Sequence, residues 1–139
     1  GFTLDFWRVA IKPGKPLLVA RRNGTVVLGL PGNPVSSYVT GFLFMLPAIL
    51  KLCGTGRCLP RPIPMPLATA LPAGGKRREF LRAEWTDNGL SADDGQDSSA
   101  LCPLAHAYAL IDRPAHADPS EADAFVPAFL LENPMQTGG

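Results

Sequence analysis

The sequence predicts an α/β segment followed by a small all-β barrel domain, and three features of its pattern support this. In the first 55 residues, short apolar runs separated by Pro/Gly and Asn-Gly turns lead into one long apolar stretch with helical spacing. A cluster of prolines then forbids regular helix between residues 60 and 66. Beyond it, strand-like runs alternate with turn signals and no convincing helix follows, which is typical of a small barrel or sandwich.

The composition supports one ordinary hydrophobic core or two small ones. The chain has 139 residues, of which 46% are hydrophobic and only 18% are charged, with 15 Pro and 14 Gly. This content of Pro and Gly indicates many turns and short strands, and the aliphatic runs are too strong for a disordered chain. We expect residues 1–55 and 67–139 to form two domains, joined by a proline-rich linker over residues 56–66.

Three strands are expected before the helix. Residues 2–11 alternate loosely between apolar and polar, residues 17–20 form a second short run, and residues 25–30 form a third. The Asn23-Gly24 pair between the second and third runs predicts a hairpin turn, because these residues tolerate positive φ. The third run is apolar almost throughout, which predicts a strand covered on both faces.

A single long helix is expected to begin after Asn33. Asn33 is a good N-cap, and Pro34 suits the first helical position because its missing N–H would be unpaired there. Pro47 should kink the helix, and Gly54 is expected just past its end. Polar interruptions favour a buried helix over a membrane span. Apolar residues at helical spacing predict a face that packs on the sheet: Tyr38, Val39, Phe42, Leu46, Ile49 and Leu50.

In the second part, short strand-like runs are separated by turns. The sequence Asp87-Asn88-Gly89 predicts a second hairpin. The expected strands are Leu67–Leu71, Arg78–Thr86, Gly89–Ala92, His106–Asp112 and Phe125–Leu131.

Charge is distributed unevenly along the chain. Residues 1–82 hold twelve Lys and Arg and two acids, whereas residues 83–139 hold one base and ten acids. This asymmetry predicts either an anion site in the first part, or attraction between the two parts or between copies of the chain. The sequence leaves both interpretations open.

The first candidate site is a cluster of cations around a Pro/Gly turn. Arg8 and Lys12 are four residues apart, so on a strand they would point to the same face, and Lys15 follows across Pro13-Gly14. Cations at a strand end can hold phosphate or a small oxyanion. The alternative is a solvated basic edge.

The second candidate site is the turn Pro31-Gly32-Asn33-Pro34, which leads from an apolar strand into the helix. A helix N-terminus presents backbone N–H groups and a positive dipole end to an anion, and Gly32 would allow close approach. Ser36 and Ser37 add hydroxyls in the first turn. No Walker lysine follows and the glycine spacing is wrong for a P-loop, which excludes that style of nucleotide hydrolysis.

Other polar groups give weaker signals. The basic run Lys76-Arg77-Arg78 has no accompanying aromatic pattern, so we interpret it as a solvated loop rather than a nucleic-acid contact. The cysteines and histidines lack metal-ligand spacing, and a reducing, cytoplasmic setting fits best. The clustered acids could bind a divalent cation but lack an EF-hand pattern. These cysteines, histidines and acids are Cys53, Cys58, Cys102, His106, His116, Asp93, Asp94 and Asp97.

Two blocks together resemble the C-terminal part of the MoeA/gephyrin family of molybdopterin molybdenumtransferases. They are residues 6–16, FWRVAIKPGKP, and residues 29–36, GLPGNPVS, in this order and at this spacing. Weaker support comes from residues 78–83, REFLRA, and 96–99, QDSS. The resemblance implies that the first part is the end of a three-layer molybdopterin-binding domain.

The resemblance also implies a reaction. The family inserts molybdate into the dithiolene of adenylylated molybdopterin and releases AMP, with Mg²⁺ assisting, and it works as a homodimer. Upstream domains would supply the metal-binding acids, so this chain by itself is expected to be inactive. The alternative is a non-catalytic molybdopterin-binding or scaffold module of the same family. Neither nucleic acid nor a membrane is an expected partner.

The resemblance assigns roles residue by residue. Lys12 and Arg8 would bind molybdate or phosphate electrostatically in the catalytic cleft, although relatives often have Lys where this chain has Arg8. Ser98 or Ser99 would match a serine that the barrel domain contributes. The remaining substrate-binding residues implied by the match are Lys15, Pro31, Gly32, Asn33, Pro34 and Ser36.

Overall fold

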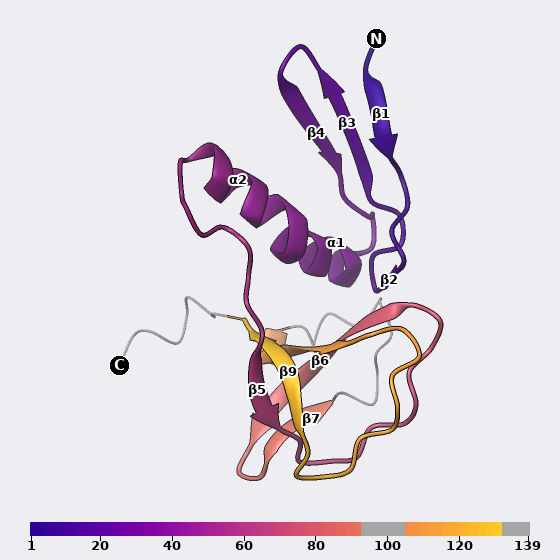
Figure 1. Ribbon diagram of the computed structural model, residues 1–139, viewed down its shortest axis with the longest axis vertical. Helices are drawn as coiled ribbons and strands as arrows, with labels where there is room; N and C mark the ends of the chain where they lie inside the picture. Colours follow the sequence, from indigo (N-terminus) through magenta and orange to yellow (C-terminus); the bar gives the residue numbers. More distant parts are fainter. Residues whose placement is uncertain (93–104, 132–139) are drawn as a thin grey trace. The chain divides into compact units, whose positions relative to one another are not determined.

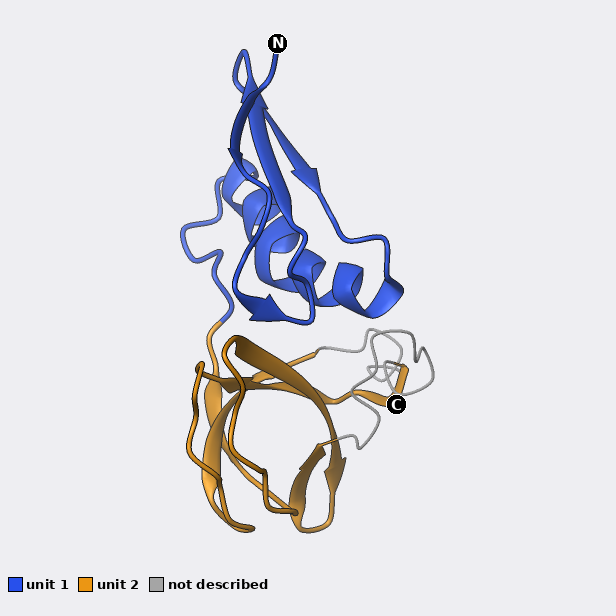
Figure 2. Cartoon of the chain, turned by 90° about the vertical axis from the view of Figure 1, so that its right-hand side faces the viewer, with its two compact units in different colours: residues 1–60 blue, residues 61–139 orange. Residues whose placement is uncertain are grey.

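The computed structural model describes residues 1–92 and 105–131 and divides the chain after Pro60 into two compact units. Unit 1 covers residues 1–60 and unit 2 covers residues 61–139 (Figure 2). Ser98 and Ser99 lie outside the described residues. Each unit is built around its own sheet (Figure 1).

Unit 1 contains a three-stranded antiparallel sheet in the order β1-β3-β4. The strands are β1 (Thr3–Phe6), β3 (Leu18–Arg22) and β4 (Thr25–Gly29). Asn23 has φ 47° and Gly24 has φ 79°, so the β3–β4 hairpin turns through two residues with positive φ. The predicted Asn-Gly hairpin is therefore confirmed.

Two expectations for these strands are wrong. The first strand ends at Phe6, and Ile11–Lys12 forms a separate two-residue strand, β2, so Arg8 lies on neither. A register shift between Leu4 and Phe6 accompanies the end of β1. β4 is an edge strand of its sheet and Val26 is 50% exposed, so this strand is not covered on both faces.

The helix runs continuously from Pro34 to Leu52 in three stretches: α1 (Pro34–Thr40), a π-helical turn η1 (Gly41–Met45) and α2 (Leu46–Leu52). Its end is a Schellman motif, because the Gly54 N–H donates to the Lys51 carbonyl at 3.1 Å and the Thr55 N–H to the Leu50 carbonyl at 3.0 Å. Gly54 has φ 82°, as its predicted place past the helix end requires.

The π-helical turn lies directly before Pro47. The Leu46 N–H donates to the Gly41 carbonyl, five residues back, and Pro47 has no N–H to continue the ladder. The predicted irregularity at Pro47 thus takes the form of a widened turn on its N-terminal side.

The whole helix, Pro34–Leu52, has a mean hydropathy of 1.5 over its most apolar window, of which 33% is buried. By length and composition alone it would reach across a bilayer. A core helix of a soluble protein passes the same test, so this is weak evidence for a membrane span.

Unit 2 contains an antiparallel sheet whose strands neighbour one another in the order β7-β6-β8-β9-β5. The predicted bounds of β6 and β7 are confirmed, and those of β8 and β9 differ from the prediction by one to three residues. The strands are β5 (Ile63–Pro66), β6 (Arg78–Thr86), β7 (Gly89–Ala92), β8 (Ala109–Arg113) and β9 (Phe125–Leu130).

The predicted strand Leu67–Leu71 is wrong, since this segment makes only isolated bridges to Leu90 and Ser120. The strand lies earlier, at β5, within the range predicted as linker. The Ala68 N–H donates to the Leu90 carbonyl at 2.8 Å, which joins the segment after β5 to β7 at the other end of the strand order.

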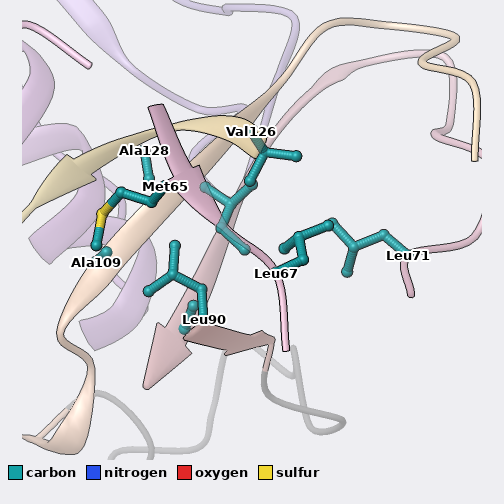
Figure 3. Close-up of a cluster of buried hydrophobic side chains, with 9 residues drawn as sticks. Met65, Leu67, Leu71, Leu90, Ala109, Val126 and Ala128 are labelled. Carbon is teal, nitrogen blue, oxygen red and sulfur yellow. The ribbon is translucent and has the colours of Figure 1, made fainter. Parts of the chain in front are cut away.

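The core of unit 2 lies inside this sheet. Side chains from β5, β7, β8 and β9 converge, as Figure 3 shows for Met65, Leu90, Ala109 and Val126. All nine core members are at most 7% exposed: Met65, Leu67, Leu71, Ala83, Leu90, Ala109, Ile111, Val126 and Ala128.

Candidate functional site

The two cations Lys12 and Lys15 lie on a short closed loop of unit 1. The Val9 N–H donates to the Lys15 carbonyl at 3.0 Å, and the Leu17 N–H donates to the same carbonyl at 3.2 Å. This pairing places residue 15 beside residue 9, so Arg8 and both lysines gather around one turn. Both lysines are exposed. The closed loop thus carries Lys12 and Lys15, and Arg8 directly precedes the residue that closes it.

Gly14 sits at the centre of this loop. It is buried and has φ +111°, a conformation that side-chain-bearing residues rarely adopt. A Cβ at this position would lie 2.5 Å from Thr40 Cγ2 and 3.3 Å from Ile11 Cδ1. Only glycine fits here, because the backbone of the loop packs directly on the helix. The peptide bond between Lys12 and Pro13 is cis.

Arg8 adopts a different arrangement from the one predicted. It follows the end of β1, and its guanidinium carbon lies 3.8 Å from the centre of the Trp7 ring. This is cation–π geometry, which suits the planar guanidinium. The prediction that Arg8 and Lys12 share one face of a strand is wrong, since no single strand contains both.

Asn33 caps the helix as predicted. Its Oδ1 accepts hydrogen bonds from the N–H groups of Val35 at 3.0 Å and Ser36 at 3.2 Å, and its carbonyl accepts from Ser37 at 2.8 Å. Pro34 has no N–H. The N–H groups of Val35, Ser36 and Ser37, which the sequence offered to an anion, are therefore already bonded within this turn.

The other residues of this turn differ in exposure. Pro31 and Ser36 are buried, and Gly32 and Pro34 are exposed. A Cβ on Gly32 would meet nothing within 4 Å, so packing does not require glycine there. The close approach of a ligand at Gly32 stays a prediction.

The electrostatics of unit 1 favour an anion. Residues 1–60 contain seven Lys and Arg and one acid, Asp5. Asp5 accepts two hydrogen bonds of 2.9 Å from Arg21, and this pairing raises the pKa of the Arg21 guanidinium above its ordinary value. The potential of this unit is thus positive.

In unit 2, one residue of the basic run 76–78 forms hydrogen bonds within the fold. Arg78 donates two hydrogen bonds to the buried carboxylate of Asp112, at 2.7 and 2.5 Å. These bonds raise the pKa of Arg78 above its ordinary value. Arg113 is buried and donates to the carbonyls of Pro72 and Asp118, at 2.6 and 2.8 Å. These arginines therefore hold loops and strands together.

A metal site is not formed by the described part of the chain. Among these residues no group of three His, Cys, Asp and Glu side chains could hold an ion. The loop around Lys12 is itself cationic and would repel Mg²⁺. Within residues 1–92 and 105–131, the side chains do not fit the Mg²⁺ that the family resemblance implies.

Sequence reasoning missed one residue of this site. Thr40 is fully buried and contacts Gly14, although 26 positions separate them. A threonine four residues after Ser36 signals a hydroxyl bonded back along the helix, but spacing alone does not show which loop its methyl group meets.

Comparison with known proteins identifies the chain. Residues 64–130 match the family model described as the MoeA C-terminal region (domain IV). Over 138 residues the chain is 36% identical to the molybdenum cofactor synthesis protein cinnamon of Drosophila melanogaster, an alignment covering 94% of this chain and 23% of that protein. The chain belongs to the MoeA family.

A second MoeA relative agrees. The molybdopterin molybdenumtransferase of Staphylococcus epidermidis is 34% identical over 136 residues, which covers 92% of this chain and 32% of that protein. The chain thus spans less than a third of the length of either relative. The family resemblance drawn from the two motif blocks is confirmed.

Solved MoeA structures share the fold. A molybdenum cofactor biosynthesis protein from Pyrococcus furiosus matches with a TM-score of 0.76 at 23% identity, over 92% of this chain and 45% of that one. The molybdopterin biosynthesis MoeA protein of Pyrococcus horikoshii matches with the same score and identity, over 92% and 32%. The predicted combination of a mixed α/β part and a strand-rich part is consistent with this likeness.

Proposed function

We propose that this chain carries one wall of the site at which a molybdopterin molybdenumtransferase inserts molybdate into adenylylated molybdopterin, with release of AMP. The observation that carries the proposal is the closed loop holding Lys12 and Lys15 beside Arg8 in a unit whose charge is positive. The names of two relatives, a molybdenum cofactor synthesis protein and a molybdopterin molybdenumtransferase, support a role in molybdenum cofactor synthesis. The adenylylated substrate and the release of AMP are what the family resemblance implies. In this proposal unit 1 is the end of a three-layer molybdopterin-binding domain and unit 2 is a barrel domain.

The residues of the loop would bind and orient the oxyanion. Lys12 and Lys15 are flexible point cations that neutralise a dianion, and the NH₂ of Asn33 adds a neutral donor. Arg8 contributes a positive charge while its guanidinium lies over the Trp7 ring. The turn Pro31–Pro34 and Ser36 would form the adjoining wall. A role for Ser98 or Ser99 rests on the family resemblance alone.

Mg²⁺, the metal-binding acids and the second subunit of a homodimer would come from elsewhere in the whole enzyme. A cytoplasmic location belongs to the same proposal. The 139-residue chain alone is expected not to insert molybdate.

The test measures the binding of inorganic molybdate to the 139-residue chain by calorimetry at low ionic strength. Lys12→Ala and Lys15→Ala should each weaken binding about tenfold, because each removes one charge-assisted hydrogen bond. Lys51→Ala is the matched control, since it removes an exposed cation of unit 1 far along the chain from the loop, and it should change binding less than twofold. Rising salt should weaken binding in the wild type.

Equal binding by the wild type and both loop variants would overturn the proposal. The alternative function, a non-catalytic molybdopterin-binding or scaffold module, predicts that the whole protein binds molybdopterin with no turnover. Magnesium-dependent insertion by the whole protein, lost in Lys12→Ala, would exclude that alternative.

A further inference from the structure

Thr40 lies at the end of α1 and is fully buried. Its Oγ1 donates to the Ser36 carbonyl at 2.7 Å and lies 3.3 Å from the Ser37 carbonyl. Because the hydroxyl is held along the helix, the rotation about Cα–Cβ is fixed, and the methyl group Cγ2 is directed away from these two carbonyls.

The methyl group lies against the cationic loop. Thr40 Cγ2 occupies the space that a side chain at Gly14 would need, 2.5 Å from the ideal Cβ position. The buried backbone of Gly14 thus rests on Thr40. One threonine therefore contacts the loop with its methyl group and the first helical turn with its hydroxyl.

The ends of the loop meet through the hydrogen bond between the Val9 N–H and the Lys15 carbonyl, and the buried Gly14 lies between Lys12 and Lys15. The contact at Gly14 therefore helps to fix where both lysines emerge relative to the helix. The helix in turn carries Asn33, whose capping bonds fix it to the same first turn.

We propose that Thr40 is a positioning residue that seats the Lys12–Lys15 loop on the helix and so sets the geometry between the two lysines and Asn33. The hydroxyl acts on the helix and the methyl group acts on the loop; neither touches the ligand. This inference rests on the proposed anion-binding function of the same loop, and its test separates the two.

The test compares Thr40→Ser with Thr40→Val. Serine keeps the hydroxyl bond and loses the methyl group, whereas valine keeps a methyl group at that place and loses the hydroxyl. Thr40→Ser should weaken molybdate binding about fourfold, the factor that corresponds to one buried methyl group, and Thr40→Val should stay within about twofold of the wild type.

Hydrogen exchange of the Val9 amide measures the seating of the loop without any ligand. Thr40→Ser should speed this exchange severalfold and leave the amides paired between β3 and β4 unchanged, whereas a general loss of stability would speed both. In a double-mutant cycle, Gly14→Ala should perturb Val9 exchange less in the Thr40→Ser background than in the wild type, because the methyl group it strikes is gone.

The outcomes are decisive in each direction. Wild-type exchange at Val9 in Thr40→Ser, or equal effects of Ser and Val, would overturn the positioning role. If the wild type binds no molybdate while Thr40→Ser still speeds Val9 exchange, the anion-binding function fails and the positioning role stands.

Discussion

Unit 2 encloses a cluster of buried apolar side chains within its own sheet, whereas most of the exposed large apolar side chains that the structure describes lie in unit 1. Nine residues form the closed core of unit 2. In unit 1, the exposed fractions reach 54% at Leu4, 52% at Trp7 and 83% at Leu52. A three-stranded sheet and one helix offer too little partner surface for these side chains. Unit 1 should therefore open more readily, and this is also the unit that carries the basic loop.

Each unit contains one tryptophan, Trp7 in unit 1 and Trp85 in unit 2, so the comparison can be measured directly. In the 139-residue chain, Trp85→Phe leaves fluorescence reporting on unit 1, and Trp7→Phe leaves it reporting on unit 2. Urea unfolding followed in these two backgrounds gives each unit its own transition.

The largest effect is expected at Gly89. It has φ +121°, and a Cβ there would lie 2.5 Å from the Pro66 carbonyl oxygen. Because this oxygen belongs to the backbone, it cannot rotate out of the way as a flexible side chain can. Gly89→Ala should lower the free energy of unfolding of unit 2 by about 3 kcal/mol or more, read from Trp85.

Gly24 is the matched position in unit 1. It has φ +79° with nothing within 4 Å of its Cβ position, so Gly24→Ala should cost about 1 kcal/mol from the backbone alone, read from Trp7. Equal costs at the two glycines would mean that close packing does not distinguish the units.

The next effect contrasts a buried with an exposed aliphatic residue. Ile111 is 0% exposed in the core of unit 2, and Ile111→Ala should lower the stability of that unit by about 3 kcal/mol. Val26 is 50% exposed on the edge strand β4, and Val26→Ala should change unit 1 by less than about 0.5 kcal/mol. A large cost at Val26, measured by the same urea titration, would contradict the open character of unit 1.

A further, modest effect concerns the helix cap. Asn33→Ala removes the acceptor for two backbone N–H groups and should destabilise unit 1 by about 1 kcal/mol, whereas Asn33→Ser keeps a capping oxygen and should cost little. Trp7 fluorescence measures both. No difference between alanine and serine would show that the cap bonds contribute nothing measurable.

Local chemistry explains what the sequence could predict. The Asn23-Gly24 turn, the Asn33 cap, the Gly54 end of the helix and the bounds of β6 depend on neighbouring residues and short periodicities, so their patterns are visible in the chain. The family resemblance likewise depended on two short blocks.

Contacts between residues far apart in the sequence explain what the sequence could not predict. The end of β1 at Phe6, the exposure of β4 and the seat of Gly14 on Thr40 depend on which segments pair across the fold. For the candidate site, the sequence identified the cations of the loop but not the Val9–Lys15 bond that closes it. The sequence predicted both an Asn33 cap and an anion beside the same turn, and the structure shows the cap bonded to the N–H groups of Val35 and Ser36, for which an anion would compete.

That competition at Asn33 has a consequence for ion selectivity. Fixed backbone N–H groups discriminate between ions by shape, whereas lysine ammonium groups rotate freely and respond mainly to charge. A site whose donors are Lys12, Lys15 and one amide is expected to rank oxyanions by valence. Under the proposed function, molybdate and tungstate, which are dianions of the same tetrahedral form, would then compete on nearly equal terms for this loop.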